Sequence, residues 1–354
     1  MILYAGSYTE MITENFGGCG EGIYCFDFDP VSGGLQLKHI TAAVNPSYLS
    51  IPSSGYLYTH TEVLAEKKPV VQAYKISKND SSLQLINEQA IPGGCPCYIH
   101  FSKKNNCILV ACYETGNTIL YPIAKDGTVL PMLKKLEHAG SSVNKLRQES
   151  AHAHAVIIDE IFNKILITDL GTDQVMVYQA STFNKKLEVK LIQAVSMPPG
   201  SGPRHIILHA ETNHAYVLNE LTATVNMMRY CNGYLTAGFV CNTLPTYFKA
   251  IPGAAAIRIS GDGKFIYTSE RSDNAISILR VDSEKETLEL TGRQDTLGKT
   301  PRDFILDPTG NWLLVVNQDS DSITIFQADR NSGYLDPVNL IEDIKSPACL
   351  HWLP

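Results

Sequence analysis

The sequence has no long apolar run and no cluster of basic residues, and these two absences exclude several classes of protein. None of its apolar stretches approaches the roughly 20 residues that a membrane-spanning helix needs. The 29 Lys and Arg residues are outnumbered by 36 Asp and Glu, which gives a net charge of −7, and they form no stripe. Because a phosphate backbone binds clustered positive charge, we expect neither nucleic-acid nor membrane binding.

The amino terminus also lacks the features of a secretion signal. Its first ten residues, MILYAGSYTE, contain no basic segment followed by an apolar core. The nine cysteines are odd in number and scattered, and Cys107, Cys112 and Cys241 lie in apolar runs, where cysteine behaves as a small hydrophobic residue. These features predict a cytoplasmic protein with reduced thiols.

Common catalytic and cofactor motifs are absent too. There is no GxSxG elbow, no Walker loop and no GxGxxG unit in a strand–turn–helix context. His152 and His154 form a His-x-His pair that can bind a metal from one face of a strand, but no third ligand follows at a suitable spacing. Cys95 and Cys97 are expected to pack rather than to bind zinc. We therefore expect no metal and no cofactor.

What the sequence does contain is a repeat. A Pro or a small residue, two variable positions and then alternating apolar residues recur seven times, at spacings of 46 to 57 residues. The copies begin at Pro46, Pro96, Ala153, Pro203, Ala254, Pro301 and Pro347. A period of this length is typical of an array of supersecondary units.

Each repeat unit contains three further strand-like runs. In the fifth unit, KFIYTSE, AISILRVD and TLELTGR follow one another and are separated by turn residues. Alternating β-branched and aromatic residues bounded by Gly, Asp and Asn are typical of hairpins. Four antiparallel strands per period, without helical periodicity, predict the blades of a β-propeller.

The two ends of the chain are expected to complete one further blade together. The last copy of the repeat, residues 347–354, supplies one strand, and the runs MILYAGSY, GIYCFDFD and LQLKHIT supply three. Shared termini would close the ring and protect the sheet edges that an open array exposes. We predict an all-β fold, a single seven-bladed propeller domain over residues 1–354, with an open β-solenoid as the alternative.

Strand order within a blade predicts where functional side chains gather. The first strand of a blade starts on the face where the second strand ends, so residues at these two points meet near the axis. The first-strand position, directly after the start of each repeat, supplies His154, Arg204 and Arg302. The end of the second strand supplies, in the first six units, Glu62, Glu114, Gly171, Glu220, Arg271 and Gln318. One mouth of the channel is thus expected to collect His154, Arg204, Glu220, Arg271 and Arg302 from four consecutive blades.

These side chains predict a site for an anion. Guanidinium groups present planar forks that suit carboxylate and phosphate oxygens. Glu220 or His154 can act as a general base on water, since both residue types can be tuned towards a neutral pKa. In the alternative interpretation, Glu220 only neutralises Arg204 or Arg271. That alternative accounts less well for the expected composition of the mouth, because one carboxylate cannot neutralise three arginines.

The chain resembles the seven-bladed lactonase family, which includes propeller-type 6-phosphogluconolactonases and fungal carboxymuconate lactonizing enzymes. The resemblance spans nearly the whole chain. It rests on LYAGSYT near the start, SGPRH at 201–205, YVLNE ending in Glu220, SERSDNAISIL around Arg271 and TPRDFILDPTGNWLLVVNQ around Arg302. WD40 propellers are not close relatives, since no Trp-Asp dipeptide ends a strand. The resemblance implies that His154, Arg204, Glu220 and Arg271 are catalytic, with Arg302 binding the substrate.

The same resemblance implies a hydrolase of the pentose phosphate pathway that opens 6-phosphogluconolactone to 6-phosphogluconate. A second hypothesis is an enzyme that forms or hydrolyses the lactone of an unphosphorylated dicarboxylate such as a carboxymuconate. A third is a non-catalytic propeller that binds a protein or a carbohydrate. The small anionic substrate is the partner that the first two hypotheses share, and the oligomeric state is left open.

The sequence departs from the family pattern in two places. Ala254, Ala255 and Ala256 replace the Pro-bearing signature, so we expect their blade to contribute little to substrate binding. The third unit is longer than the others, and its extra segment HAGSSVNKLRQES precedes His154. We expect this segment to reshape the mouth of the channel.

Overall fold

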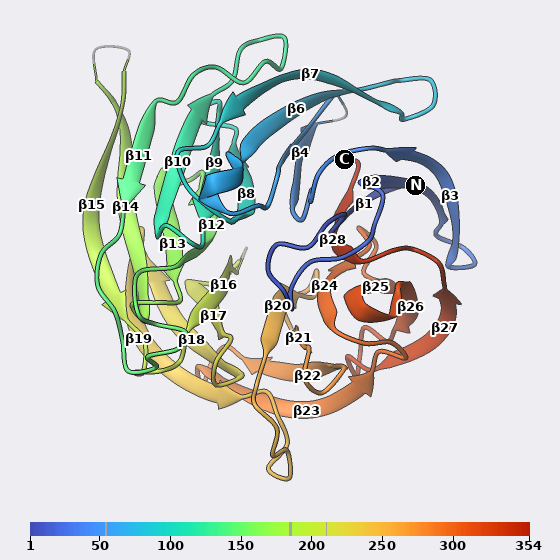
Figure 1. Cartoon of the computed structure of the whole chain (residues 1–354). Helices are drawn as coiled ribbons and strands as arrows, with labels where there is room; N and C mark the ends of the chain where they lie inside the picture. Colours follow the sequence, from blue (N-terminus) through green and yellow to red (C-terminus); the bar gives the residue numbers. More distant parts are fainter. Residues whose placement is uncertain (54, 184–185, 210) are drawn as a thin grey trace.

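The ring of sheets predicted from the repeat is present in the computed structural model, which describes residues 1–53, 55–183, 186–209 and 211–354. These residues form seven antiparallel sheets of four strands each. The innermost strands of neighbouring sheets contact one another around the whole circle, and the circle closes where β28 meets β4. Figure 1 looks along the axis of this ring. The prediction of a seven-bladed β-propeller is confirmed.

Six sheets each consist of four consecutive strands, and the seventh combines the two ends of the chain. The seventh is made of β28 (Pro347–Trp352), β1 (Ile2–Ser7), β2 (Ile23–Asp29) and β3 (Gly34–Thr41). The other six, from the axis outwards, are β4 (Leu49–Ser53), β5 (Tyr56–His60), β6 (Val70–Ile76) and β7 (Leu83–Ala90); β8 (Pro96–Ser102), β9 (Cys107–Cys112), β10 (Asn117–Pro122) and β11 (Lys134–Glu137); β12 (Ala153–Asp159), β13 (Lys164–Asp169), β14 (Gln174–Phe183) and β15 (Lys186–Ser196); β16 (Pro203–Leu208), β17 (His214–Asn219), β18 (Thr224–Cys231) and β19 (Tyr234–Asn242); β20 (Ala254–Ile259), β21 (Phe265–Glu270), β22 (Ala275–Asp282) and β23 (Thr287–Asp295); β24 (Pro301–Leu306), β25 (Trp312–Asn317), β26 (Ser322–Ala328) and β27 (Leu335–Ile341).

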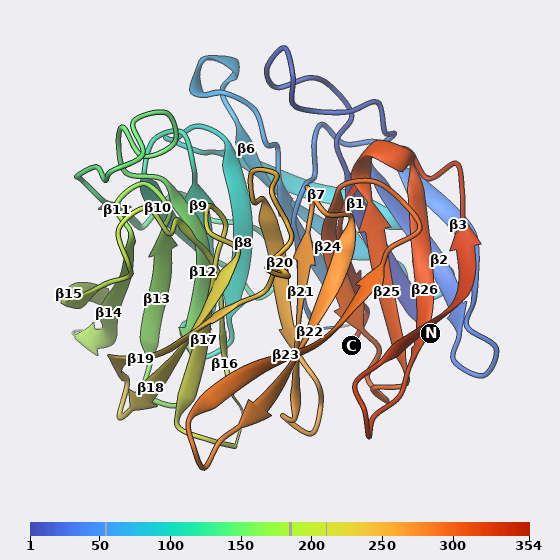
Figure 2. The ribbon, with the colours of Figure 1, turned by 90° about the horizontal axis from the view of Figure 1, so that it is seen from below.

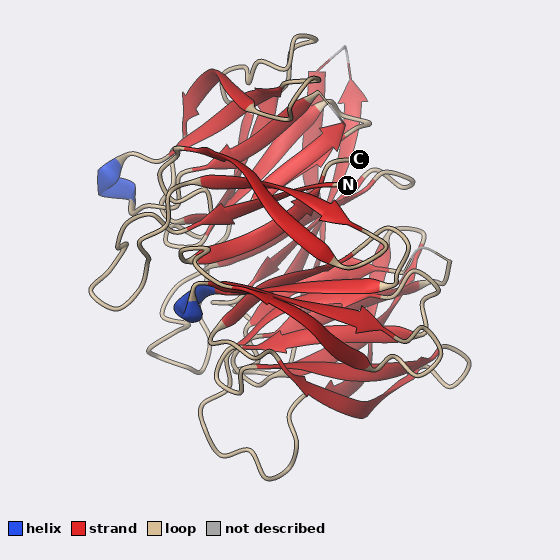
Figure 3. Ribbon diagram, turned by 90° about the vertical axis from the view of Figure 1, so that its right-hand side faces the viewer, coloured by secondary structure: helices blue, strands red, loops and turns tan. Residues whose placement is uncertain are grey.

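Helix is limited to two short 3₁₀ turns in the described residues, η1 (Ala65–Lys67) and η2 (Gln318–Ser320). Each follows the second strand of a blade, and Figure 3 shows both turns on the same side of the molecule. No helix within these ranges is long and apolar enough to cross a membrane. On the same side, the connections between β1 and β2, between β5 and β6 and between β11 and β12 project beyond the strands (Figure 2).

The termini share a blade, as the sequence predicts. Leu3 on β1 faces Trp352 on β28 in an antiparallel pair, and the two chain ends lie close together in Figures 1 and 3. A hydrophobic cluster covers this junction. The Phe28 ring packs against the indoles of Trp312 and Trp352, with ring centroids 6.1 and 5.3 Å apart. The indole N–H of Trp352 donates to the carbonyl of Leu306 on the neighbouring sheet (2.8 Å).

A recurring β-bulge decides which side chains reach the axis. In six of the seven inner strands the pairing with the second strand skips a position next to the first residue of the repeat. A bulge leaves its extra residue out of the ladder and re-aims its side chain. The skipped positions include Cys97, His154, Arg204, Ala255, Arg302 and Ala348. The repeat signature in the sequence therefore indicates the position of a β-bulge.

We predict that Trp352→Ala lowers the free energy of unfolding by about 3–5 kcal/mol, because it leaves a cavity in the cluster that covers the closing blade. Urea denaturation followed by circular dichroism measures this change. Val31→Ala, in the turn between β2 and β3 of the same blade, is the control, because Val31 is 88% exposed and its loss should cost less than about 0.5 kcal/mol. Equal effects of the two changes would contradict a role for this cluster in closure.

Candidate active site

A cavity of about 750 Å³ lies near the axis, on the face where the inner strands begin and the second strands end. All five side chains predicted to meet at the channel mouth line it: His154, Arg204, Glu220, Arg271 and Arg302. Ring closure brings them together, since they come from four blades. Their catalytic and binding roles stay predictions at this point.

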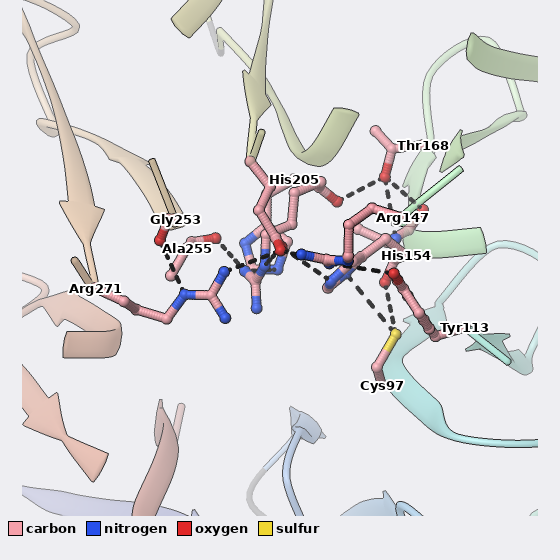
Figure 4. Close-up of polar contacts among 12 residues, drawn as sticks. Cys97, Tyr113, Arg147, His154, Thr168, His205, Gly253, Ala255 and Arg271 are labelled. Atoms are coloured by element: carbon pink, nitrogen blue, oxygen red, sulfur yellow. Dashed lines mark hydrogen bonds and ion pairs between the residues drawn. The ribbon is translucent and has the colours of Figure 1, made fainter. Parts of the chain in front are cut away.

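Glu220 lies at the centre of the charged groups. It directly follows β17 and is only 4% exposed. One carboxylate oxygen, Oε1, accepts from Arg147 Nη2 (2.8 Å) and is 3.1 Å from Arg271 Nη2. The other, Oε2, lies 3.1 Å from Arg204 Nε. Figure 4 shows Arg147 and Arg271 approaching the centre of the group from opposite sides. Three guanidinium groups thus share one carboxylate.

Burial and neighbouring charges set the protonation states of this cluster. Burial by itself raises the pKa of Glu220, but the guanidinium groups of Arg271, Arg147 and Arg204 outweigh it and hold that pKa well below its usual range. Burial, with the charge of Arg271, lowers the pKa of Arg204 to about 10, which leaves it a cation at neutral pH. Burial and the charge of Arg204 hold the pKa of His154 well below 6.5. At neutral pH the site therefore contains charged arginines, a carboxylate and a neutral imidazole.

Backbone carbonyls of the blade that starts with β20 hold two of the arginines, Arg271 of the same blade and Arg204 of the blade before it. Arg271 Nε donates to the carbonyl of Gly253 (2.9 Å), and Arg204 Nη1 donates to the carbonyl of Ala255. We expected this blade to contribute little, because alanines replace its signature. Its carbonyls nevertheless position both guanidinium groups, since a backbone acceptor does not depend on the side chain that its residue carries.

Arg302 is held in a different way. Its guanidinium lies over the rings of Tyr8 and Phe16, 4.9 Å from each centroid. The residue is 9% exposed, and within the described part of the chain no carboxylate comes within ion-pair distance of it. Cation–π contacts stabilise the charge here without neutralising it.

Comparison with known proteins identifies the family. The chain matches the family described as "Lactonase, 7-bladed beta-propeller" over residues 2–352. It is a member of that family. The 6-phosphogluconolactonase of Bacillus subtilis is 29% identical, with 99% of this chain and 98% of the relative covered. That of Formosa agariphila is 31% identical over 94% of each chain. The solved structure of a periplasmic gluconolactonase from Pseudomonas aeruginosa is 28% identical, with a TM-score of 0.90 and 100% and 99% of the two chains covered.

Sequence reasoning missed Arg147 of this lactonase as a member of the site. Arg147 lies in the long connection between β11 and β12, outside the strand repeat, so no register rule points to it. Besides Glu220, its Nη2 donates to the hydroxyl of Tyr113 (3.2 Å). The only signal in the sequence was the unusual length of the third unit, which was expected to reshape the mouth and does line it through Arg147.

Asp173 anchors the connection that carries Arg147. Its carboxylate accepts from the hydroxyl of Ser142 (2.6 Å), the amide of Gln148 (2.7 Å) and the backbone N–H of Gly200 (2.6 Å) and Gly202 (2.7 Å). Gly202 lies two residues before Arg204. One buried carboxylate thus joins the segments that carry two of the arginines of the lactonase site.

The expected ratio of one carboxylate to three arginines is wrong. Four arginines line the cavity, and three further glutamates do so as well: Glu62, Glu114 and Glu149. Arg147, Arg204 and Arg271 gather around Glu220 on one side, whereas Glu62 and Glu114 come from the blades of β4 and β8. The cavity of the lactonase therefore has a cationic wall and an acidic wall.

The His-x-His pair does not complete a metal site. The Nδ1–H of His152 donates to the carbonyl of Tyr113 (2.8 Å), and its ring stacks on that tyrosine with centroids 4.4 Å apart. His154 Nε2 is 3.9 Å from Glu220 Oε2. In the ranges that the structure describes, no three His, Cys, Asp or Glu side chains are grouped so that they could hold a metal ion.

We predict that Glu220→Gln destabilises the lactonase by about 3–5 kcal/mol at neutral pH, because it removes the counter-charge of buried guanidinium groups. The folded-state pKa of Glu220 is depressed, so the ionised carboxylate stabilises the fold above its ordinary pKa of 4.5, and this stabilisation is lost as the pH falls. The difference in unfolding free energy between wild type and variant should therefore narrow below about pH 4.5.

Urea denaturation at a series of pH values measures this difference. Glu149→Gln is the control, because the side chain of Glu149 is 56% exposed and its loss should have little effect. A difference between wild type and Glu220→Gln that does not change with pH would contradict the ion-pair assignment.

Proposed function

We propose that this lactonase hydrolyses 6-phosphogluconolactone to 6-phosphogluconate. The observation that supports this most is the sharing of one carboxylate by three guanidinium groups, which leaves local positive charge for an anion. The side chains of Arg147 and Arg271 are 43% and 22% exposed and reach the opening of the cavity. They are placed to take a phosphate group. The names of the Bacillus and Formosa relatives point to the same substrate.

The deeper cations serve the lactone ring in this proposal. Arg204 and Arg302 are 4% and 9% exposed and line the inner part of the cavity, and we assign Arg204 to the reacting carbonyl and Arg302 to substrate binding beside it. When water attacks the carbonyl carbon of a lactone, negative charge develops on the carbonyl oxygen. Fixed cations in a water-poor site stabilise that charge without further reorganisation, and this is usually a large part of catalysis.

His154 is our choice for the general base. Its imidazole is neutral at pH 7, whereas Glu220 is held by three guanidinium groups and is a weak proton acceptor. His154 takes a proton from the attacking water as the new C–O bond forms. The tetrahedral intermediate collapses with cleavage of the ring C–O bond, and the proton passes to the ring oxygen, which becomes the hydroxyl of the open acid. Glu220 orients the arginines.

A second candidate substrate is an unphosphorylated sugar lactone. The solved Pseudomonas neighbour is named a gluconolactonase, and guanidinium groups bind carboxylates as well as phosphates.

With the phosphorylated substrate, we also propose a cytoplasmic location and a step in the pentose phosphate pathway. Cell fractionation tests the location, since recovery of the protein outside the cytoplasmic fraction would contradict it.

The purified protein is expected to open 6-phosphogluconolactone faster than buffer alone. Arg271→Ala should lower kcat/KM for this substrate by about a hundredfold, because a charge-assisted contact with the phosphate is lost. The loss should be smaller for gluconolactone, which lacks the phosphate. Arg280→Ala, an exposed arginine on β22, is the control. No acceleration over buffer with either lactone would reject the proposal, and a preference for gluconolactone would favour the second candidate.

His154→Gln is expected to lower kcat by about 10²–10⁴-fold, the usual range for removal of a general base. Because the pKa of His154 is lowered, the acidic limb of the kcat/KM profile should lie well below pH 6.5. Stopped-flow pH titration of lactone opening measures both quantities. If His154→Gln keeps the wild-type kcat while Glu220→Gln loses it, the base is Glu220.

A further inference from the structure

The acidic wall of the cavity contains one buried carboxylate, Glu62, that is in no ion pair among the described residues and that the proposed reaction does not use. Glu62 follows β5, in the blade that starts with β4. That blade lies three places round the ring from the one that carries Glu220, so the two residues belong to nearly opposite sides of the ring. Glu62 is only 3% exposed, and it lines both the main cavity and a small pocket directly beneath it.

The backbone of Glu62 is firmly held. Its N–H donates to the carbonyl of Asn45 (3.1 Å), and its carbonyl accepts from the side-chain amide of Asn45 (2.9 Å). The side-chain carbonyl of Asn45 in turn accepts from the N–H groups of Thr9 (2.7 Å) and Glu10 (3.0 Å). This network fixes Glu62 relative to the β1–β2 connection, which carries Tyr8 and Phe16.

The carboxylate of Glu62 is only half satisfied. Its Oε2 accepts from the hydroxyl of Tyr8 (2.8 Å). Among the described residues, no Lys, Arg or His lies within ion-pair distance of it, and Oε1 has no hydrogen-bond donor. Placing a carboxylate in a buried position without a cation is costly unless donors from water or a ligand solvate it.

Arg302 contacts the same tyrosine. Its guanidinium lies 4.9 Å over the Tyr8 ring, while the hydroxyl of that ring is bound to Glu62. Arg302 and Glu62 both line the small pocket as well as the main cavity. Tyr8 thus contacts both a half-used acceptor and a guanidinium donor without an ion pair among the described residues, and both groups are more than nine-tenths buried.

We propose that Glu62, Tyr8 and Arg302 form a subsite for the hydroxyl groups of a polyhydroxylated lactone. Neighbouring hydroxyls of a sugar both donate and accept, so they match a carboxylate acceptor beside guanidinium donors. A phosphate group carries negative charge at neutral pH and offers mainly acceptor oxygens, so the Glu62 carboxylate repels it. This inference rests on the proposed function. In the resulting orientation of the substrate, the sugar hydroxyls lie towards Glu62 and the phosphate lies towards Arg147 and Arg271.

The test compares binding of two probes to the whole protein by titration calorimetry, namely inorganic phosphate and 6-phosphogluconate. Glu62→Gln and Tyr8→Phe should weaken 6-phosphogluconate binding, by about tenfold or more for the first, because a buried acceptor for a sugar hydroxyl is lost. Neither change should weaken the binding of inorganic phosphate. Arg271→Ala should weaken both probes. Glu66→Gln, in the exposed η1 turn outside the cavity, should affect neither.

Equal losses for the two probes, or no loss of 6-phosphogluconate binding in either variant, would overturn the subsite. Cooperative unfolding of each variant shows that it is folded, and Tyr8→Phe provides the same comparison if Glu62→Gln does not fold. Lactone assays on wild type keep the two proposals apart. If wild type does not hydrolyse the lactone but the probe selectivity holds, the proposed function fails and the subsite stands. If hydrolysis holds without the selectivity, the subsite fails.

Discussion

The antiparallel pairing of β28 with β1 is the constraint on which the rest of the structure depends. A propeller blade contacts only its two neighbours, so seven blades share one axis only when the last is joined to the first. Here the joint is a backbone ladder inside a single sheet, covered by Phe28, Trp312 and Trp352. If the ladder opened, Glu62 and Arg302 would no longer line one cavity, because the shared blade lies between the two blades that carry them.

Within the closed ring, an irregularity of the backbone directs the side chains of the candidate site towards the axis. A regular strand would alternate its side chains between the two faces of a blade, towards the cores that neighbouring blades share. The bulge at the start of the inner strands releases one residue per blade from this alternation. His154, Arg204 and Arg302 occupy such positions. The alanine-bearing blade holds Arg204 and Arg271 through the backbone carbonyls of Ala255 and Gly253.

The charged side chains of the cavity lie in two separate groups, and they are not simply matched in isolated ion pairs. On one side, a buried carboxylate orders three guanidinium groups and is itself made a poor base by them. On the other, Glu62 is buried with no cation of the described chain at ion-pair distance, and Arg302 lies over aromatic rings. Fixed charges of this kind cost folding free energy, and they are ready for a ligand that has an anionic end and a hydroxyl-rich end. A phosphorylated sugar lactone has both, in keeping with the lactonase family to which the chain belongs.

The sequence by itself determined the ring, its closure by the termini and the positions that face the axis, because a repeated pattern of strands and turns records local backbone geometry in every copy. Only the tertiary structure decided which charges meet there. Arg147 enters the cavity from a connection whose path depends on the distant carboxylate of Asp173, and no repeat encodes such a contact. The depressed pKa of Glu220 and the half-satisfied carboxylate of Glu62 likewise arise from burial and from partners on other blades. Local pattern specifies strand and register, whereas charge pairing is set by groups that become neighbours only after the ring has closed.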